Sequence, residues 1–176
     1  MFRTVEQGNT EGKTNMSKEL CSYIAGFLDG DGCIMLQLVY RHDYVLGYQI
    51  RASIVFYQKQ QYRSFLEWIQ GQFDGIGYIR NRNDGMSEYT IVGITDVEKV
   101  LTMLFPYLRL KKPQAEITIK VIKQMPGSGR KMTKEKLLEL AKEVDRFLEL
   151  NYSKRRTNTS EKVKEFFDHP KPYLIP

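Results

Sequence analysis

The sequence predicts an α+β fold with the order αββαββα, a curved antiparallel sheet saddle, helices packed on one face and additional C-terminal helices. Three observations support this prediction. A helix-like segment followed by two strand-like segments occurs twice in succession between residues 17 and 94. Each strand-like segment has one apolar face, so helices need to cover only one side of the sheet. A chain of 176 residues, 41% of them hydrophobic, is long enough for one core and short for two.

The first unit begins with a helix after Ser17, a residue type that caps helices well. Apolar side chains then recur at helical spacing at Leu20, Ile24, Phe27 and Leu28. The helix should end at the glycines of residues 29–32, which read Asp-Gly-Asp-Gly. Two period-2 segments follow over residues 33–41 and 47–58, and both predict strands.

The second unit begins with a helix that carries Phe65, Leu66, Ile69 and Phe73. Strands over residues 76–82 and 87–94 follow, joined by a hairpin turn at residues 83–85, Asn-Asp-Gly. Residues 95–98, Thr-Asp-Val-Glu, form a capping box that predicts a helix from this point to before Pro106.

Three further helices are expected in the C-terminal part of the chain. Pro113 should open the first, which runs through Met125, and Thr133 should cap a long amphipathic helix to about Leu150. A basic, polar connector and a short helix follow. We therefore expect a flexible lead-in over residues 1–16, one folded domain over 17–160, and a short helix and tail over 161–176.

Composition restricts the function classes. Lys and Arg number 27 against 21 Asp and Glu, which leaves a charge of +6 and makes a polyanion, above all nucleic acid, the natural partner. Two Cys and two His are too few for a disulfide framework or a Cys/His zinc site. No apolar stretch is long enough to span a bilayer and no export signal opens the chain, so we expect no membrane partner and an intracellular location. The polar face of the predicted sheet would be cationic and open, bearing Gln37, Arg41, Gln49, Arg51, Arg80 and Arg82.

The end of the first helix holds the most informative stretch. Asp29 and Asp31 stand where the helix dipole disfavours negative charge, and a divalent cation would remove that penalty. Ser22, Gly26 and Gly30 lie four residues apart, so one side of the helix is nearly free of bulk. This side could pack inside one chain or against the same helix of a second chain, where a two-fold axis would bring two copies of Asp31 together. An EF-hand calcium loop does not fit, because Cys33 and Tyr40 occupy two of its ligand positions.

Residues 23–32, Tyr-Ile-Ala-Gly-Phe-Leu-Asp-Gly-Asp-Gly, resemble the LAGLIDADG motif. Further matches follow in order at residues 58–59, Gln-Lys, at 77–80, Gly-Tyr-Ile-Arg, and at 106–111, Pro-Tyr-Leu-Arg-Leu-Lys. From about Ser17 to about Ser160, the chain is similar to single-motif, homodimeric LAGLIDADG homing endonucleases of the kind encoded in green-algal organellar introns.

The resemblance implies a site, residue by residue. Asp31 would bind the catalytic Mg²⁺, with Mn²⁺ or Ca²⁺ as substitutes in binding, and Gly30 would offer its backbone carbonyl to metal. Gln58 and Lys111 would shape the solvent pocket. Close relatives often carry a basic residue where this chain has Tyr62, followed by Arg63, so that part of the site departs from the pattern. The matching DNA-binding positions are Gln37, Arg41, Tyr44, Gln49, Arg51, Arg80, Arg82 and Glu88. Lys154 and Arg155, also expected to bind DNA, look more like phosphate contacts. The dimer interface would include Ser22, Ala25, Gly26 and Asp29.

The resemblance also implies an activity. The chain would hydrolyse both strands of a long pseudo-palindromic double-stranded DNA target, act as a homodimer on no small-molecule substrate, and promote intron mobility. It would work in a chloroplast or, alternatively, in a mitochondrion or prokaryotic cytoplasm. Two other functions fit the same fold: an intron RNA maturase, and a non-catalytic sequence-specific DNA-binding protein such as a repressor. The presence of Asp31, Gln58 and Lys111 argues against the pure binder, which has no evident need for all three.

Overall fold

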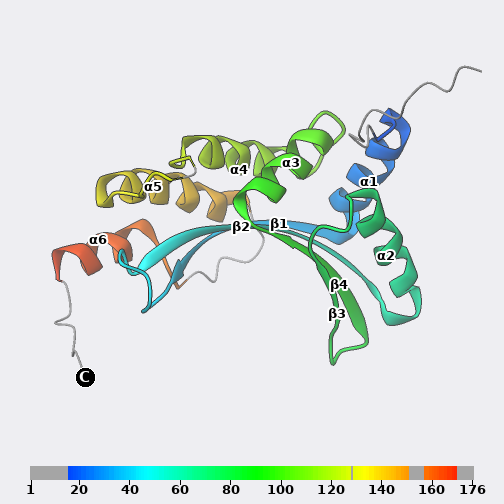
Figure 1. Ribbon diagram of the computed structural model, residues 1–176, viewed down its shortest axis with the longest axis horizontal. Coiled ribbons are helices and arrows are strands. Elements are labelled where there is room, and N and C mark those ends of the chain that lie inside the picture. The colour runs from blue at the N-terminus through cyan, green and yellow to red at the C-terminus, as the bar shows by residue number, and fades with distance from the viewer. Residues whose placement is uncertain (1–15, 128, 151–156, 170–176) are drawn as a thin grey trace, which may run out of the picture.

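The computed structural model describes residues 16–127, 129–150 and 157–169, and it contains the α+β fold that the sequence predicts (Figure 1). The four described strands form one antiparallel sheet in the order β1-β2-β4-β3. The elements are α1 (Lys18–Asp31), β1 (Gly32–Tyr40), β2 (Tyr48–Lys59), the 3-10 helix η1 (Gln60–Tyr62), α2 (Arg63–Gln72), β3 (Tyr78–Asn81), β4 (Met86–Val92), α3 (Ile94–Leu104), α4 (Lys112–Gln124), α5 (Lys134–Leu150) and α6 (Ser160–Asp168).

Local sequence signals set most of these boundaries. Ser17 caps α1, because its hydroxyl accepts a hydrogen bond from the Leu20 N–H at 3.2 Å. The Thr133 hydroxyl accepts one from Lys136 N–H at 3.1 Å in the first turn of α5, as expected. Gly85, at φ 79°, completes the predicted turn between β3 and β4. Pro113 lies in the first turn of α4, where its missing N–H costs nothing.

The predicted capping box is wrong. Helix α3 begins at Ile94, and its N-cap is Gly93, which makes no side-chain capping bond. Gly93 adopts φ 100°, a conformation that glycine reaches easily, and this lets the chain turn directly from β4 into the helix. The start of the helix therefore moves ahead of Thr95. The strand predicted over residues 76–82 is also shorter, covering only Tyr78–Asn81.

The sheet has one buried face and one open face. On β1, Ile34, Leu36 and Leu38 are at most 4% exposed, and they alternate with side chains on the opposite face. The antiparallel register continues both faces across the sheet. Figure 1 shows the sheet arched, with α3, α4 and α5 above it, α1 and α2 at one end and α6 at the other, and none of the described helices lies beneath its concave side. The helices thus close the core on one side and leave a saddle on the other.

The C-terminal helix α6 shares this core. Val163 is fully buried, and Phe166 packs edge-on against Tyr48 of β2 at a ring-centroid distance of 5.6 Å. Asn158 donates its side-chain amide to the Leu38 carbonyl at 2.9 Å. We expected the folded domain to end at residue 160, where α6 begins. These contacts attach α6 to the first two strands. None of the described helices is long and apolar enough to cross a bilayer.

Candidate metal centre and nucleic-acid interface

The junction between α1 and β1 places the acidic end of the predicted motif. Asp31 is the last residue of α1, and β1 begins at the next residue without a loop. Both Gly30 and Asp31 are exposed. Gly30 lies in the last turn of the helix, where carbonyl groups lack intrahelical partners. A carboxylate and a backbone carbonyl are therefore available at one exposed point.

These donors fit a hard divalent cation, which prefers oxygen ligands. They do not complete a site alone, because the described residues contain no cluster of three or more His, Cys, Asp or Glu side chains able to hold a metal ion. Mg²⁺ commonly uses one or two carboxylates together with substrate phosphates and water. The remaining ligands would come from substrate phosphates and water.

Asp29 points away from this exposed point, toward another segment of its own chain. Its Oδ2 accepts hydrogen bonds from the backbone N–H groups of Arg109 at 2.7 Å and Leu110 at 3.1 Å. Its Oδ1 accepts one from the N–H of Lys111 at 2.8 Å. The carboxylate that we expected at a dimer interface is thus engaged within the chain.

Lys111 lies at the same junction. Its ammonium group donates to the Asp29 carbonyl in α1. Burial raises the pKa of the Cys33 thiol, and the nearby positive charge of Lys111 partly opposes that rise. Because Cys33 is the second residue of β1, the Lys111 ammonium stands beside the start of the sheet. The structure therefore brings Lys111 close to the motif, as the resemblance implies.

Gln58 and Arg63 are less closely connected to the motif. Gly32, which follows Asp31, pairs with Phe56, and Gln58 lies two residues further along β2 at the same end of the sheet. Among the described residues, no hydrogen bond joins Gln58 to Asp31 or Lys111; its Oε1 accepts from the Lys59 N–H. Arg63 donates instead to Glu67 and to Asn81, both at 2.8 Å.

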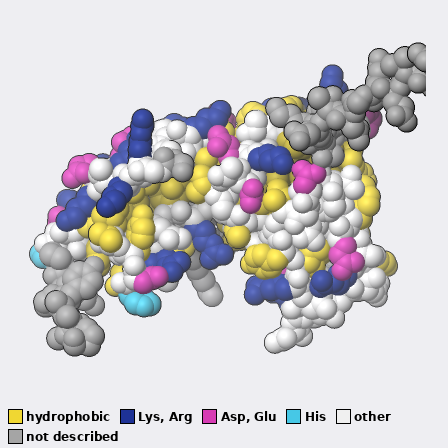
Figure 2. All heavy atoms as spheres, in the orientation of Figure 1, with side chains coloured by type: hydrophobic (Ala, Val, Ile, Leu, Met, Phe, Trp, Pro, Cys, Tyr) yellow, Lys and Arg dark blue, Asp and Glu magenta, His cyan; other side chains and the backbone are white. Residues whose placement is uncertain are grey.

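The open face carries the predicted polar positions in register. Gln37 of β1 lies opposite Arg51 of β2, and Val39 lies opposite Gln49. Both Gln37 and Arg51 are exposed, so their polar ends can reach a ligand lying along the sheet. Figure 2 shows Lys and Arg side chains on both flanks of the hollow beneath the sheet.

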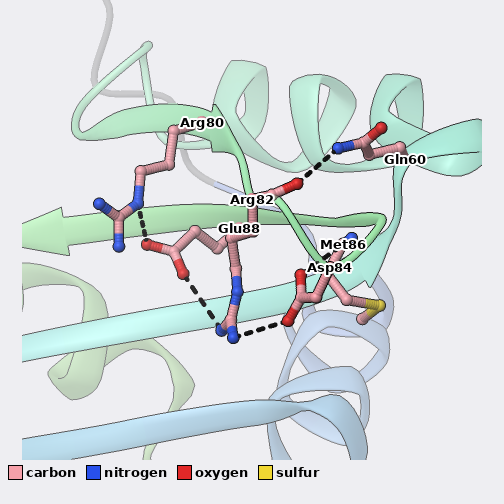
Figure 3. Close-up of polar contacts among 6 residues, drawn as sticks. All are labelled: Gln60, Arg80, Arg82, Asp84, Met86 and Glu88. Carbon is pink, nitrogen blue, oxygen red and sulfur yellow. Dashed lines mark hydrogen bonds and ion pairs between the residues drawn. The ribbon is translucent and has the colours of Figure 1, made fainter.

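The β3–β4 side of this face holds an arginine cluster, consisting of Arg80, Arg82, Asp84 and Glu88 (Figure 3). The Glu88 side chain is only 8% exposed, and its carboxylate pairs with Arg80 at 2.5 Å and Arg82 at 3.7 Å. Arg82 also pairs with Asp84 at 2.8 Å and lies over the Tyr57 ring, 5.9 Å from its centroid. Glu88, which we predicted to bind DNA directly, therefore holds both guanidinium groups on the open face.

The 3-10 helix anchors the hairpin that carries this cluster. Gln60 donates its backbone N–H to the Gly85 carbonyl at 2.9 Å and its side-chain amide to the Arg82 carbonyl at 2.8 Å. Across the turn, Asp84 Oδ1 accepts from the Met86 N–H at 3.2 Å. The turn between β3 and β4 is thereby fixed to the end of β2.

The loop between β1 and β2 presents the other predicted contacts. Arg41 makes a two-bond ion pair with Asp43, at 3.0 and 2.6 Å, and this pairing lowers the pKa of the Asp43 carboxyl. Backbone bonds close the loop from Arg41 N–H to the Gly47 carbonyl, at 2.7 Å, and from Gly47 N–H to the Tyr44 carbonyl, also at 2.7 Å. Arg41 thus lies in the loop that follows β1, just after the strand in which we placed it.

The small-residue side of α1 is partly exposed. Ser22 and Gly26 are exposed, and a Cβ built on Gly26 or Gly30 would meet no atom within 4 Å. Ala25 differs, because it is fully buried in the protomer core and offers no surface to a second chain. The exposed strip therefore consists of Ser22, Gly26 and Gly30. Two predicted phosphate contacts, Lys154 and Arg155, lie outside the described residues.

Two aromatic residues on the open face were missing from the predicted DNA-binding set. Tyr57 lies beneath Arg82, and Tyr78 is 44% exposed opposite Thr90. The signal for both was present in the alternation, because Tyr57 shares its parity with Gln49 and Arg51 on the same strand. The predicted set included Tyr44 of the β1–β2 loop but left out these two strand tyrosines, which share the spacing of the polar positions.

Comparisons with known proteins agree with this geometry. Residues 24–117 match the family model described as LAGLIDADG endonuclease. DNA endonuclease I-CvuI of Chlorella vulgaris is 41% identical over 153 residues, covering 86% of this chain and 92% of that protein. DNA endonuclease I-CreI of Chlamydomonas reinhardtii is 37% identical over 155 residues, covering 88% of this chain and 93% of that protein.

Solved structures extend the comparison to the fold. Two crystal structures of I-CvuI, one with the I-CreI target in the presence of Mg²⁺ and one with its own target in the presence of Ca²⁺, match with a TM-score of 0.78. Both are 39% identical to this chain, and each match covers 84% of this chain and 92% of the I-CvuI chain. This chain belongs to the LAGLIDADG endonuclease family.

Proposed function

We propose that the protein is a homing endonuclease that cuts both strands of a long pseudo-palindromic DNA site and promotes the mobility of its intron. One observation carries the proposal: a concave sheet face that carries Lys and Arg side chains ends at the α1–β1 junction, where Gly30 and Asp31 are exposed and Lys111 donates to the neighbouring Asp29 carbonyl. The face suits recognition of a duplex, and the junction suits hydrolysis of its backbone. The family match supports the same reaction class.

Recognition would use the open face. Arg and Gln side chains pair bidentately with guanine and adenine in the major groove, and the sheet presents Gln37, Arg51, Arg80 and Arg82 toward one side. Glu88 would act by holding Arg80 and Arg82 rather than by reading bases, because its carboxylate is buried between them. Arg41, Tyr44 and Gln49 would extend the contacts along β1 and β2. Lys154 and Arg155 would contact phosphates, which position the protein without specifying sequence.

A homodimer would complete the enzyme. One chain has a single saddle and one exposed motif carboxylate, whereas cutting both strands requires two reaction centres. The exposed strip of Ser22, Gly26 and Gly30 leaves room for a second helix to approach closely. Two-fold pairing there would place two copies of Asp31 near each other and match a pseudo-palindromic site.

Each residue of the junction has a part in the chemistry. Asp31 and the Gly30 carbonyl would hold Mg²⁺, for which Mn²⁺ or Ca²⁺ would substitute in binding. The bound metal would supply Lewis-acid stabilisation of the charge on the attacking and leaving oxygens. Lys111 would offset negative charge at the cleaved phosphate, and Gln58 would orient water at the end of β2.

A cleavage assay tests this function. Duplexes would carry either the I-CreI target, on which I-CvuI was crystallised, or intron-free organellar ribosomal RNA genes. We expect a discrete double-strand cut in Mg²⁺ that is lost in EDTA and in Asp31→Asn, while Asp31→Asn still binds DNA in Ca²⁺. Asp74→Asn, an exposed carboxylate change outside the junction, should cut like the wild type. Binding without cleavage by the wild type would indicate a repressor, and preference for intron RNA would indicate a maturase.

The location remains a prediction of the resemblance. The two named relatives come from Chlorella vulgaris and Chlamydomonas reinhardtii, which is consistent with a chloroplast enzyme. Fractionation of the source cells, with detection of the protein by antibody, would decide between chloroplast and mitochondrion.

A further inference from the structure

Asp29 connects two segments that are far apart in the sequence. Its carboxylate accepts three backbone hydrogen bonds, from the N–H groups of Arg109, Leu110 and Lys111. Its backbone carbonyl accepts a fourth hydrogen bond, from the Lys111 ammonium group. The same aspartate therefore holds both the backbone and the side chain of Lys111.

The two helix ends compensate each other. Lys111 is the N-cap of α4, and its own side chain makes no capping bond there. N–H groups at the start of a helix attract an anion, and Asp29 of α1 accepts from the N-cap N–H of Lys111 and from the two N–H groups just before it. The C-terminal end of α1 attracts a cation in turn, and Lys111 supplies it. Each helix end thus receives from the other the charge that it lacks.

This arrangement restrains a flexible side chain. A lysine side chain has four carbons and three rotatable donors, and left free it occupies many rotamers. Here its backbone is fixed by charge-assisted hydrogen bonds, and its ammonium group is fixed at a carbonyl in the last turn of α1. That turn also contains Gly30 and Asp31. The position of the Lys111 charge relative to Asp31 therefore depends on Asp29.

We propose that Asp29 is the positioning residue for Lys111, holding its ammonium group beside Asp31 so that both act on the same phosphate. The proposal rests on the nuclease function proposed above. The Asp29 carboxylate already accepts three backbone hydrogen bonds from residues 109–111, so we assign it a hold on Lys111 rather than a metal-ligand role. Its role is to fix where the positive charge stands during cleavage.

The decisive experiment separates cleavage from binding. Asp29→Asn keeps the size of the side chain but replaces one acceptor oxygen with a donor that faces N–H groups. We expect the single-turnover cleavage rate at saturating protein in Mg²⁺ to fall by about tenfold or more. The reason is that Lys111 loses the charged hydrogen-bond partner that holds it in place. Affinity for the duplex in Ca²⁺ should change by less than about twofold. Asp74→Asn, the same substitution at an exposed ion pair with Lys99, should change neither quantity.

A second background tests whether Asp29 acts through Lys111. In Lys111→Met, the added Asp29→Asn change should lower the remaining rate by less than about twofold, because the group to be positioned is gone. Equal losses in both backgrounds, or a loss of affinity with an unchanged rate, would overturn the proposal. Should Asp29→Asn not fold, Asp29→Glu serves instead, since it retains the charge but is one methylene longer and should displace Lys111.

Amide hydrogen exchange provides a readout that does not depend on cleavage. In the wild type, the amides of residues 109–111 should exchange slowly, and in Asp29→Asn they should exchange about tenfold faster or more. Unchanged exchange would show that Asp29 does not hold the turn. A wild type that holds these amides but cuts no DNA would instead contradict the nuclease function, so the two failures are distinguishable.

Discussion

The hydroxyl of Thr90 is the one buried side-chain polar atom among the described residues that has no hydrogen-bond partner. Thr90 is 5% exposed on β4, where its side chain faces the open side of the sheet between Tyr78 and Val55. Burial without a partner costs free energy, and valine has nearly the same shape without the hydroxyl. Thr90→Val should therefore raise the free energy of unfolding by about 1 kcal/mol, measured by urea denaturation.

Thr118 provides the matched control at the residue scale. It is buried as well, at 0% exposed, but its hydroxyl donates to the Gln114 carbonyl at 2.8 Å. Thr118→Val should lower the free energy of unfolding by about 0.5–1 kcal/mol, because a satisfied hydrogen bond is lost. If Thr90→Val also lowered stability, the hydroxyl would have to be bonded to ordered water.

At the scale of elements, Glu143 connects α5 to α4. Its carboxylate accepts from Lys120 of α4 at 3.0 Å and from Arg146 at 3.2 Å, and the hydrogen bond from Lys120 is the main cause that lowers its pKa. A carboxylate with a folded-state pKa below its unfolded value stabilises the protein above the unfolded pKa, and this stability is lost as pH falls through the folded pKa.

Glu143→Gln should accordingly cost about 0.5–1 kcal/mol at about pH 7, because the group is only 25% exposed. The difference from the wild type should vanish as the pH falls below the folded-state pKa. Urea denaturation at several pH values measures both quantities. Glu139→Gln, which removes an exposed pair within α5, should have little effect at any pH. A pH-independent cost at Glu143 would show that packing, not charge, is lost.

Element order was predictable because periodicity and turn residues are local signals. The period-2 spacing of Ile34, Leu36 and Leu38 identified the buried face of β1 correctly. The start of α3 was missed because a positive φ at Gly93 cannot be distinguished by sequence from an ordinary strand end. The inward orientation of Asp29 was missed for another reason. Its partners at residues 109–111 lie about eighty residues away, and only tertiary structure reveals them.

At the scale of the whole molecule, the chain has the features expected of one half of the homodimer proposed above. The saddle, the junction and the exposed strip on α1 occur once in each chain, whereas a duplex has two strands to cut. Gly26 bears on this directly. Glycine inside a helix costs about 1 kcal/mol relative to alanine, yet a Cβ at Gly26 would meet nothing within 4 Å of its own chain. A second body that approaches this face would explain why the position has no side chain.

Gly26→Leu should therefore separate the protomers while leaving each one folded. In sedimentation we expect the wild type at twice 20.6 kDa and the variant at 20.6 kDa, with unchanged helix content by circular dichroism. Gly71→Leu is the matched control, because Gly71 is also an exposed helical glycine with open space around its Cβ. It should remain a dimer. A Gly26→Leu protein that still sediments as a dimer would move the two-fold axis away from α1, and with it the pairing of the two Asp31 carboxylates.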